Sequence, residues 1–328
     1  MKAVDVFVDK FADIIIKRMD SVNPADWQKP WISSNAMSIP RNISGRAYNR
    51  YNMLLLMFMS QLKGYKTNYW LTYNQASALG VKVLQGQEAT PVLIFKPFAV
   101  NKHTNERISE EDYQALTLDQ KADYDHRYYA SYYNVFNVDQ TNTQEVNPQL
   151  YSKCLPARPQ TNEITSTNDV LDSMLSSGSW CCKISEKISS EAYYSPLEDI
   201  IVVPERTQFP DTNEFYSTLL HEMAHSTAPD GRLNRNRDNY AREELVAELS
   251  SVVNGALLGV SSLPSKDNIR YIKGWQERIT SDKNFLKSTI FDVGRVVNFT
   301  EERLGLSFKN NIGKDLTQEY KQDKTIKL

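Results

Sequence analysis

The sequence predicts an α+β protein of two domains. Its 328 residues are enough for one large or two ordinary domains with a substantial core. Helical and strand periodicities both occur in the first part of the chain, whereas the second part is mainly helical around a short strand pair. Residues 146–166 contain prolines and no sustained period, which indicates a linker. We therefore expect domains at 1–145 and 167–308, followed by a polar tail at 309–328.

The first domain mixes helices with two strands. Apolar residues recur at helical spacing over residues 1–20, and further helices are expected near 49–63 and 73–79. The stretch PVLIFKPFAV, 91–100, has the composition of a strand. The run YYASYYNVFNV, 128–138, is rich in aromatic and other strand-favouring residues, so we expect it to pair with that strand.

The second domain is expected to consist of helices near 167–176, 211–227, 241–259, 266–282 and 284–305, with a short strand pair within 182–204. Asp211 and Glu214 have the spacing of a helix-capping box. After this cap, Phe215, Leu219 and Met223 recur every four residues, a stripe that would bury one side of the helix.

Neither a signal peptide nor a membrane span is evident. Acidic residues interrupt the apolar positions of the first twenty residues, and no apolar run approaches the length of a span. With only Cys154, Cys181 and Cys182, a disulfide framework is not expected, and we interpret the last two as small buried side chains. These features predict a cytoplasmic protein without a membrane partner.

One short motif points to catalysis. The stretch STLLHEMAHST, 217–227, places His221 and His225 one helical turn apart, so both rings project from one face and can share a metal ion. Glu222 follows the first histidine and would lie beside the metal as a general base. This HExxH pattern predicts one Zn²⁺ per chain in a metallopeptidase site; the alternative is two polar residues on an ordinary helix.

The third zinc ligand is expected from the next helix. Glu244 and Glu248 are four residues apart, so both can face the histidine helix. We favour Glu248 as the ligand and Glu244 as the residue that holds a ligand histidine by its second nitrogen, although the reverse remains open. Glu243 is expected to point into solvent.

Other residues near the motif have two interpretations each. The stretch EDIIVVPE, 198–205, is either a substrate-binding edge strand or an ordinary core strand. Tyr193 or Tyr194 is either an oxyanion donor or a packing residue. The remaining histidines, His103 and His126, lie in an acidic part of the first domain and are expected at the surface.

The N-terminal region is basic and aromatic. Residues 21–100 contain eight Lys or Arg against two acidic residues, interleaved with Trp and Tyr. Cations that follow phosphates and rings that stack on unpaired bases are typical of single-stranded nucleic-acid binding, although any one ring is more commonly core. The candidate DNA contacts are Trp27, Lys29, Trp31, Arg46, Tyr48, Arg50, Tyr69, Trp70 and Lys96.

Ordered blocks along the chain resemble the ArdC-type antirestriction proteins of conjugative elements. In the first domain these are WQKPW, GRAYNRYNMLLL, YWLTYNQASALG, GQEATPVLIFKP and YYNVFNVDQ. In the second they are AYYSPLEDIIVVPERTQF, FYSTLLHEMAHST, GRLNR, REELVAELSS and YIKGWQERI. One departure is Ala228, where we expect glycine.

The resemblance implies an N-terminal mixed α/β domain that binds single-stranded DNA and a C-terminal, mainly helical zincin-like domain with a small sheet. It also implies zinc at His221 and His225 with a glutamate from EELVAE, and Glu222 as base. The expected function is protection of incoming mobile-element DNA, with an unidentified protein substrate such as the restriction machinery. The rival hypotheses are a DNA-coating protein whose zinc is structural or vestigial, and a protease without a DNA role.

Overall fold

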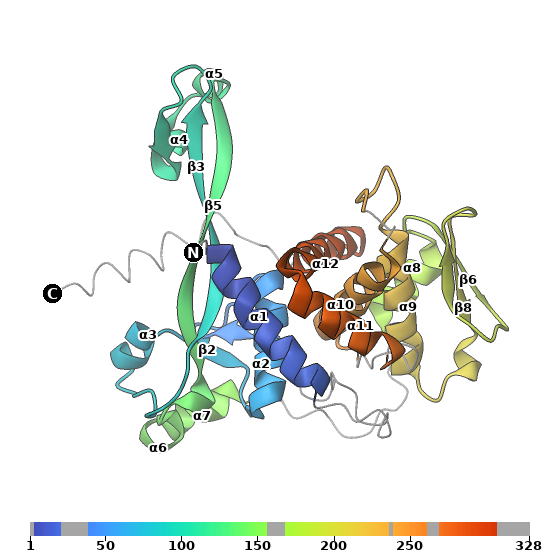
Figure 1. Cartoon of the computed structure of the whole chain (residues 1–328), viewed down its shortest axis with the longest axis horizontal. Coiled ribbons are helices and arrows are strands. Elements are labelled where there is room, and N and C mark those ends of the chain that lie inside the picture. The colour runs from blue at the N-terminus through green and yellow to red at the C-terminus, as the bar shows by residue number, and fades with distance from the viewer. Residues whose placement is uncertain (1–2, 21–38, 156–167, 236–238, 261–268, 307–328) are drawn as a thin grey trace.

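The computed structural model of the chain describes residues 3–20, 39–155, 168–235, 239–260 and 269–306. It confirms the α+β prediction. A sheet with flanking helices forms the N-terminal part, and a helical C-terminal part carries a small second sheet (Figure 1). None of the helices in these ranges is long and apolar enough to cross a membrane.

The N-terminal part mixes helices and strands. Its helices are α1 (Ala3–Asp20), α2 (Arg50–Lys63), α3 (Tyr73–Ala78), α4 (Glu110–Ala115), α5 (Leu118–Lys121), α6 (Thr143–Val146) and α7 (Pro148–Cys154), with a 3₁₀ turn η2 (Val138–Gln140). Its strands are β1 (Arg41–Asn42), β2 (Tyr69–Leu71), β3 (Thr90–Asn101), β4 (Arg107–Ser109) and β5 (Tyr124–Asn137). Helix α2 is apolar on all sides over residues 53–59 and is correspondingly buried.

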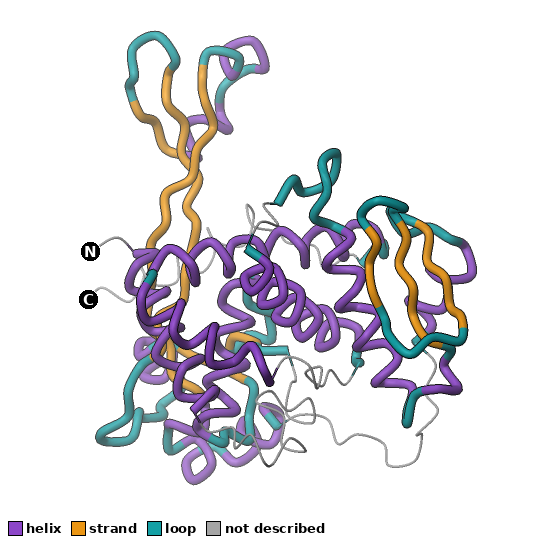
Figure 2. The backbone as a smooth tube through the Cα atoms, turned by 45° about the vertical axis from the view of Figure 1, so that its right-hand side comes forward, coloured by secondary structure: helices purple, strands orange, loops and turns teal. Residues whose placement is uncertain are grey.

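The five strands form one sheet in the order β1-β2-β5-β3-β4. The predicted pairing of β3 with β5 is confirmed, and it runs without interruption from Thr90 opposite Val135 to Asn101 opposite Tyr124. Both strands are longer than the rest of the sheet, so their far ends project from the molecule as a ribbon that carries β4, α4 and α5 (Figures 1 and 2). We call this projection the arm; it comprises residues 96–129.

Over its described residues, the C-terminal part has five longer helices and a small sheet. Its elements are α8 (Asp169–Ser177), β6 (Lys183–Lys187), β7 (Tyr193–Ser195), β8 (Ile200–Pro204), η3 (Arg206–Gln208), α9 (Thr212–Ser226), α10 (Tyr240–Leu258), α11 (Ile269–Ser281) and α12 (Lys283–Arg303). Strand β8 pairs with β6 on one side and β7 on the other, so the stretch EDIIVVPE supplies the central strand. Its interpretation as an edge strand is therefore wrong.

The two parts share one hydrophobic core. Phe11 of α1 and Phe58 of α2 belong to the same buried cluster as Val253 of α10 and Trp275 of α11. A buried ion pair between Arg50 of α2 and Glu301 of α12 also joins the parts. The N-terminal helices therefore support the helices on which the C-terminal part is built.

The segment expected to be a linker begins with ordered structure. Helix α7 lies within 146–166, with Asn147 as its N-cap and Pro148 at its first position. The Tyr151 hydroxyl donates a hydrogen bond of 2.6 Å to Asp139, and Tyr151 and Cys154 are buried against the N-terminal sheet. Residues 156–167 and the tail 309–328 lie outside the described ranges.

Candidate metal centre

Helix α9 presents the HExxH motif from a fixed position. The Asp211 side chain caps the helix by accepting a hydrogen bond from the Glu214 backbone N–H. Phe215, Leu219 and Met223 are buried in the second hydrophobic cluster, as their spacing predicts. Because this stripe fixes the rotation of the helix, both histidines face α10.

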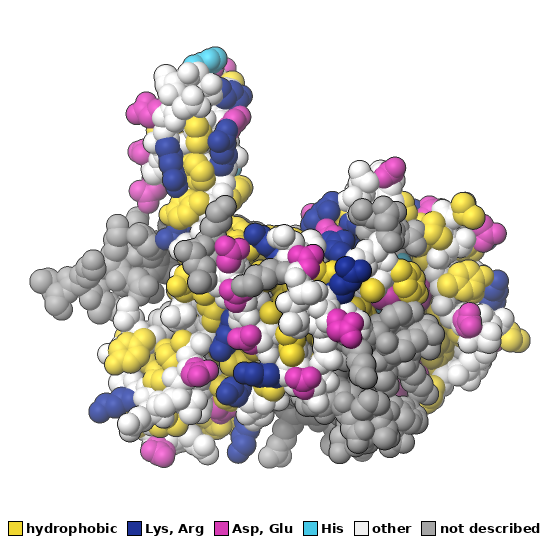
Figure 3. Space-filling model, viewed as in Figure 1, with side chains coloured by type: hydrophobic (Ala, Val, Ile, Leu, Met, Phe, Trp, Pro, Cys, Tyr) yellow, Lys and Arg dark blue, Asp and Glu magenta, His cyan; other side chains and the backbone are white. Residues whose placement is uncertain are grey.

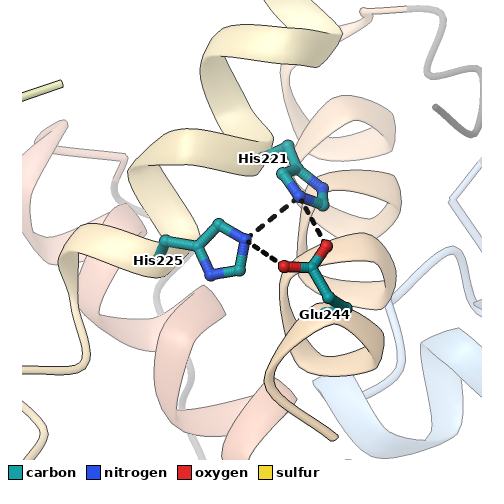
Figure 4. Close-up of side chains that lie close together, drawn as sticks. All are labelled: His221, His225 and Glu244. Carbon is teal, nitrogen blue, oxygen red and sulfur yellow. Dashed lines mark hydrogen bonds and ion pairs between the residues drawn. The ribbon is translucent and has the colours of Figure 1, made fainter. Parts of the chain in front are cut away.

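Three donor groups from α9 and α10 converge (Figure 4). The Nε2 atoms of His221 and His225 are 3.1 Å apart. The Glu244 carboxylate spans them, with one oxygen 3.6 Å from His221 Nε2 and the other 3.4 Å from His225 Nε2. These three donor atoms lie within 4.8 Å of one another, the only such group of three metal-ligating side chains among the residues that the structure describes.

The Nδ1 atom of His225 is held by a buried ion pair between Glu243 and Arg235. This nitrogen donates a hydrogen bond of 3.1 Å to Glu243, whose other oxygen accepts one of 2.7 Å from Arg235. Arg235 in turn donates to the Ala224 carbonyl of α9, at 2.8 Å. The expectation that Glu243 points into solvent is wrong, because Glu243 and Arg235 are both buried. Arg235 ends the GRLNR block of the family resemblance, but its partner Glu243 is set by tertiary packing, which no local pattern reveals.

Glu248 takes the corresponding position beside His221. Its carboxylate lies 3.5 Å from His221 Nδ1, on the side of the ring away from Glu244. The two glutamates are therefore arranged in the opposite way to the one we favoured from sequence. Glu244 lies at the meeting point of the two imidazoles, and Glu248 lies beside the other nitrogen of His221.

This arrangement suits a cation. Carboxylates accept hydrogen bonds, so Glu243 and Glu248 favour the proton on Nδ1 of each ring and leave the two Nε2 lone pairs facing one another. Two lone pairs and a carboxylate repel one another unless a cation or a proton lies among them. Two imidazoles and one carboxylate are the ligand set of a class of catalytic zinc sites.

The charges of the centre are strongly coupled. Burial alone would lower the pKa of His221, but the carboxylates of Glu244 and Glu248 outweigh it and raise that pKa well above its ordinary value. The pKa of His225 is raised in the same way, by Glu243 and Glu244 against the effect of burial. Burial would raise the pKa of Glu244, yet the two histidines hold it well below its usual range. The site therefore concentrates negative charge around the imidazoles.

Glu222 lies next to the centre without joining the ligand group. It is buried, and its charge contributes to the raised pKa of both histidines. The His221 side chain keeps 14% of its surface exposed, whereas that of Glu248 keeps 2%. The centre is therefore largely buried, with small exposed areas on both histidines.

The other residues named beside the motif have separate partners. The Tyr194 hydroxyl donates to Asp199 at 2.8 Å, and burial followed by this bond raises the pKa of Tyr194 to about 12. Tyr193, its neighbour in β7, is exposed. Cys181 and Cys182 are half-buried and lie outside the ligand group. His103 and His126 pair with Asp123 and Glu110 on the arm, away from the motif.

Three of the predicted DNA contacts are core residues. The Trp70 ring has no exposed surface and packs edge-on against Tyr65, and Tyr48 is buried in the main cluster. Arg50 is committed to its buried ion pair with Glu301. A buried ring offers no face to a base, so the prediction for Trp70 is wrong. Tyr48 and Arg50 are buried but line the same cavity as Arg46, so their contacts with DNA stay predictions.

The other predicted contacts have different positions. Arg46 is exposed and lines a cavity with Asn42, Tyr51 and Tyr133 at the base of the arm. Tyr69 is half-buried, and Lys96 lies on the arm near the Tyr129 ring. Trp27, Lys29 and Trp31 lie outside the described residues.

Two families of known domains match the chain. Residues 6–136 match the N-terminal domain of anti-restriction factor ArdC, and residues 177–291 match a zincin-like metallopeptidase domain. Among solved structures, the metal-free crystal structure of antirestriction protein ArdC from the R388 plasmid has a TM-score of 0.63 at 25% identity, covering 90% of this chain and 96% of that one. Its Mn(II)-bound form has a TM-score of 0.62, also at 25% identity, covering 92% and 99%.

Curated relatives extend beyond this chain. Two proteins named DNA primase TraC from Escherichia coli are 25% identical over 305 residues and 30% identical over 284 residues. These alignments cover 89% and 82% of this chain but 27% and 18% of the primases, so the chain spans about a quarter or less of their length. An uncharacterized protein, y4eC of Sinorhizobium fredii, is 28% identical over 270 residues, covering 79% of this chain and 80% of that protein.

Proposed function

Because the chain is an ArdC-type protein, we propose that it is an antirestriction protein that binds single-stranded DNA and carries a zinc-dependent HExxH peptidase. The protein protects incoming mobile-element DNA in the cytoplasm, and its substrate is a protein that acts on that DNA, such as the restriction machinery. The likeness to R388 ArdC and to the TraC primases supports this proposed role in protecting mobile-element DNA.

The convergence of two imidazole nitrogens and one carboxylate carries the peptidase part of the proposal. His221, His225 and Glu244 hold one zinc ion per chain, with Glu244 as third ligand in place of Glu248. Mn(II) occupies one of the R388 ArdC crystal structures, but nitrogen-rich ligand sets suit zinc better than manganese. When bound, zinc supplies Lewis acidity that makes water nucleophilic at neutral pH and polarises the peptide carbonyl.

The side chains of this chain perform the proton transfers and the positioning. Glu222 accepts the proton of the attacking water and delivers it to the leaving amine, a role that contributes about 10²–10⁴-fold to rate. Glu248 orients His221, and Glu243 orients His225 from its ion pair with Arg235. Their contacts keep both Nε2 lone pairs available for the metal.

The decisive experiment replaces Glu222 with Gln. Glu222→Gln retains zinc, measured by metal analysis, and retains DNA binding, but its proteolytic rate falls by about 10²–10⁴-fold because the amide cannot accept the proton. Glu214→Gln, a change of the same chemistry on the same helix, is the control and leaves the rate unchanged. The measured quantity is the rate at which each variant cleaves a protein that is bound to the single-stranded DNA used in the binding assay.

The rival hypothesis of a DNA-coating protein makes the opposite prediction. If Glu222→Gln protects incoming DNA in cells as well as the unchanged protein does, protection comes from coating, and the zinc is structural or vestigial. A full chain that binds no single-stranded DNA at low salt would instead remove the DNA part of the proposal and leave a protease without a DNA role.

A further inference from the structure

The two faces of the arm differ in charge. In Figure 3, basic side chains flank a column of hydrophobic side chains along the arm. The register explains this pattern, because residues that pair across antiparallel strands point to the same face. Lys96 pairs with Tyr129, Phe98 pairs with both Arg127 and Ser109, and Arg107 pairs with Val100 on that same face. We call the surface formed by Lys96, Phe98, Arg107, Arg127 and Tyr129 the arm face.

Cations and rings on the arm face hold one another in place. The Arg107 guanidinium lies 3.8 Å from the centre of the Phe98 ring and 4.9 Å from that of Tyr129. The Lys96 ammonium lies 5.9 Å from the centre of the Tyr129 ring. Tyr129 nevertheless keeps 40% of its surface exposed. The face thus offers oriented positive charge beside an accessible aromatic plane.

The opposite face of the ribbon is acidic. There, His126 stacks on Tyr113 of α4 and lies 2.5 Å from Glu110 at the start of that helix. Helix α4 also carries Glu111 and Asp112 in its first turn. On the arm face, Asp125 is paired with Arg127 at 3.0 Å. An anionic ligand would therefore be attracted to the arm face and repelled by the face beneath α4.

We propose that the arm face binds single-stranded DNA, with Lys96, Arg107 and Arg127 contacting phosphates and Tyr129 stacking on a base. This inference rests on the proposed DNA binding and assigns it to a surface that takes only Lys96 and Phe98 from the basic region 21–100 and its other residues from the acidic segment that follows. Interleaved cations and exposed rings are how proteins hold unpaired strands, and a guanidinium held over a ring loses little further freedom when a phosphate binds.

The test measures binding of the full chain to a labelled oligothymidylate of about 20 nucleotides by fluorescence anisotropy at several salt concentrations. Tyr129→Ala weakens binding by about tenfold or more without changing the salt dependence, because it removes a stacking surface. Arg107→Gln weakens binding and lowers the slope of log K against log salt by about 0.7, the value for one lost contact with a single-strand phosphate.

Matched controls come from the other side of the same arm. Tyr128, 56% exposed, points to the opposite face, so Tyr128→Ala leaves affinity unchanged. Lys121 lies over the Tyr113 ring beside that face, so Lys121→Gln leaves the salt slope unchanged. Circular dichroism checks that each variant folds.

The outcomes separate this inference from the proposed function. If the unchanged chain binds the oligonucleotide but Tyr129→Ala and Arg107→Gln bind equally well, the arm face is not the binding surface, and DNA binding itself stands. If the unchanged chain does not bind, the DNA part of the proposed function fails with it. Equal binding of a duplex, with the same dependence on Tyr129 and Arg107, would overturn the assignment to single strands.

Discussion

The metal centre and the arm face differ in how they hold charge. At the metal centre, buried carboxylates surround two imidazoles, and the Glu243–Arg235 pair fixes one ring from behind. On the arm face, cations lie over aromatic rings on a ribbon that projects from the molecule (Figure 2). The first arrangement suits a small cation held in a fixed geometry, and the second suits a long polyanion that approaches from solvent.

The sharpest test of the metal centre distinguishes its two glutamates. Glu244→Gln removes a carboxylate from the meeting point of both imidazoles and is expected to lower zinc affinity by more than 100-fold, whereas Glu248→Gln removes an orienting contact and costs about 10- to 100-fold. Chelator competition measures both. Binding of oligothymidylate should be unchanged in each variant, since neither residue lies on the arm.

The opposite ranking would restore Glu248 as the third ligand. If Glu248→Gln loses zinc while Glu244→Gln retains it, the metal-bound centre has a different arrangement from the one in Figure 4. Equal, small losses in both variants would mean that a group other than these two carboxylates completes the ligand set.

The sequence predicts the metal helix far better than the arm. An i, i+4 histidine pair, an Asp cap and an apolar stripe are local signals, so α9 and its orientation follow from residues within one helix. The choice between Glu244 and Glu248 depends on how α10 packs on α9, which spacing alone leaves open. Arg235 reaches Glu243 only through tertiary packing.

The amino-acid composition of residues 21–100 is a poor guide to DNA contacts because it does not reveal which side chains are buried. Trp70 and Tyr48 count as aromatic residues in a basic region, yet both are core, and Arg50 pairs with a residue 251 positions away. The arm face, conversely, lies partly in a region that is acidic on average. Alternation along β3 and β5 sorts those charges onto opposite faces, and only the strand register reveals it.

A second prediction tests whether the N-terminal and C-terminal parts unfold as one unit. Arg50 and Glu301 form a buried pair between α2 and α12, and burial lowers the pKa of Arg50. Glu301→Ala leaves the guanidinium buried without its partner carboxylate, so we expect the free energy of unfolding to fall by about 3–5 kcal/mol. The control is the exposed neighbour Glu302. Glu302→Ala should change the free energy of unfolding by less than about 0.5 kcal/mol.

Hydrogen exchange in α2 and α12 shows which helices are destabilised by Glu301→Ala. Because both helices belong to one core, amides of the two should lose protection together in Glu301→Ala. Loss confined to α12 would contradict a shared core and would make the two parts independent units.

The smallest effect comes from two glycines of the supporting helices. A Cβ at Gly294 of α12 would lie 2.5 Å from the Tyr51 ring of α2, so Gly294→Ala must displace that ring or separate the helices, and should destabilise the protein by about 1–3 kcal/mol. At Gly274 of α11 nothing lies within 4 Å of the new atom, and Gly274→Ala should stabilise by about 0.5–1 kcal/mol through helix propensity. Urea unfolding measures both.

Because α12 packs against α10, which carries Glu244, Gly294→Ala should also weaken zinc binding while DNA binding on the arm persists. A neutral or stabilising effect of Gly294→Ala would mean that the Tyr51 ring leaves room for a Cβ at this position.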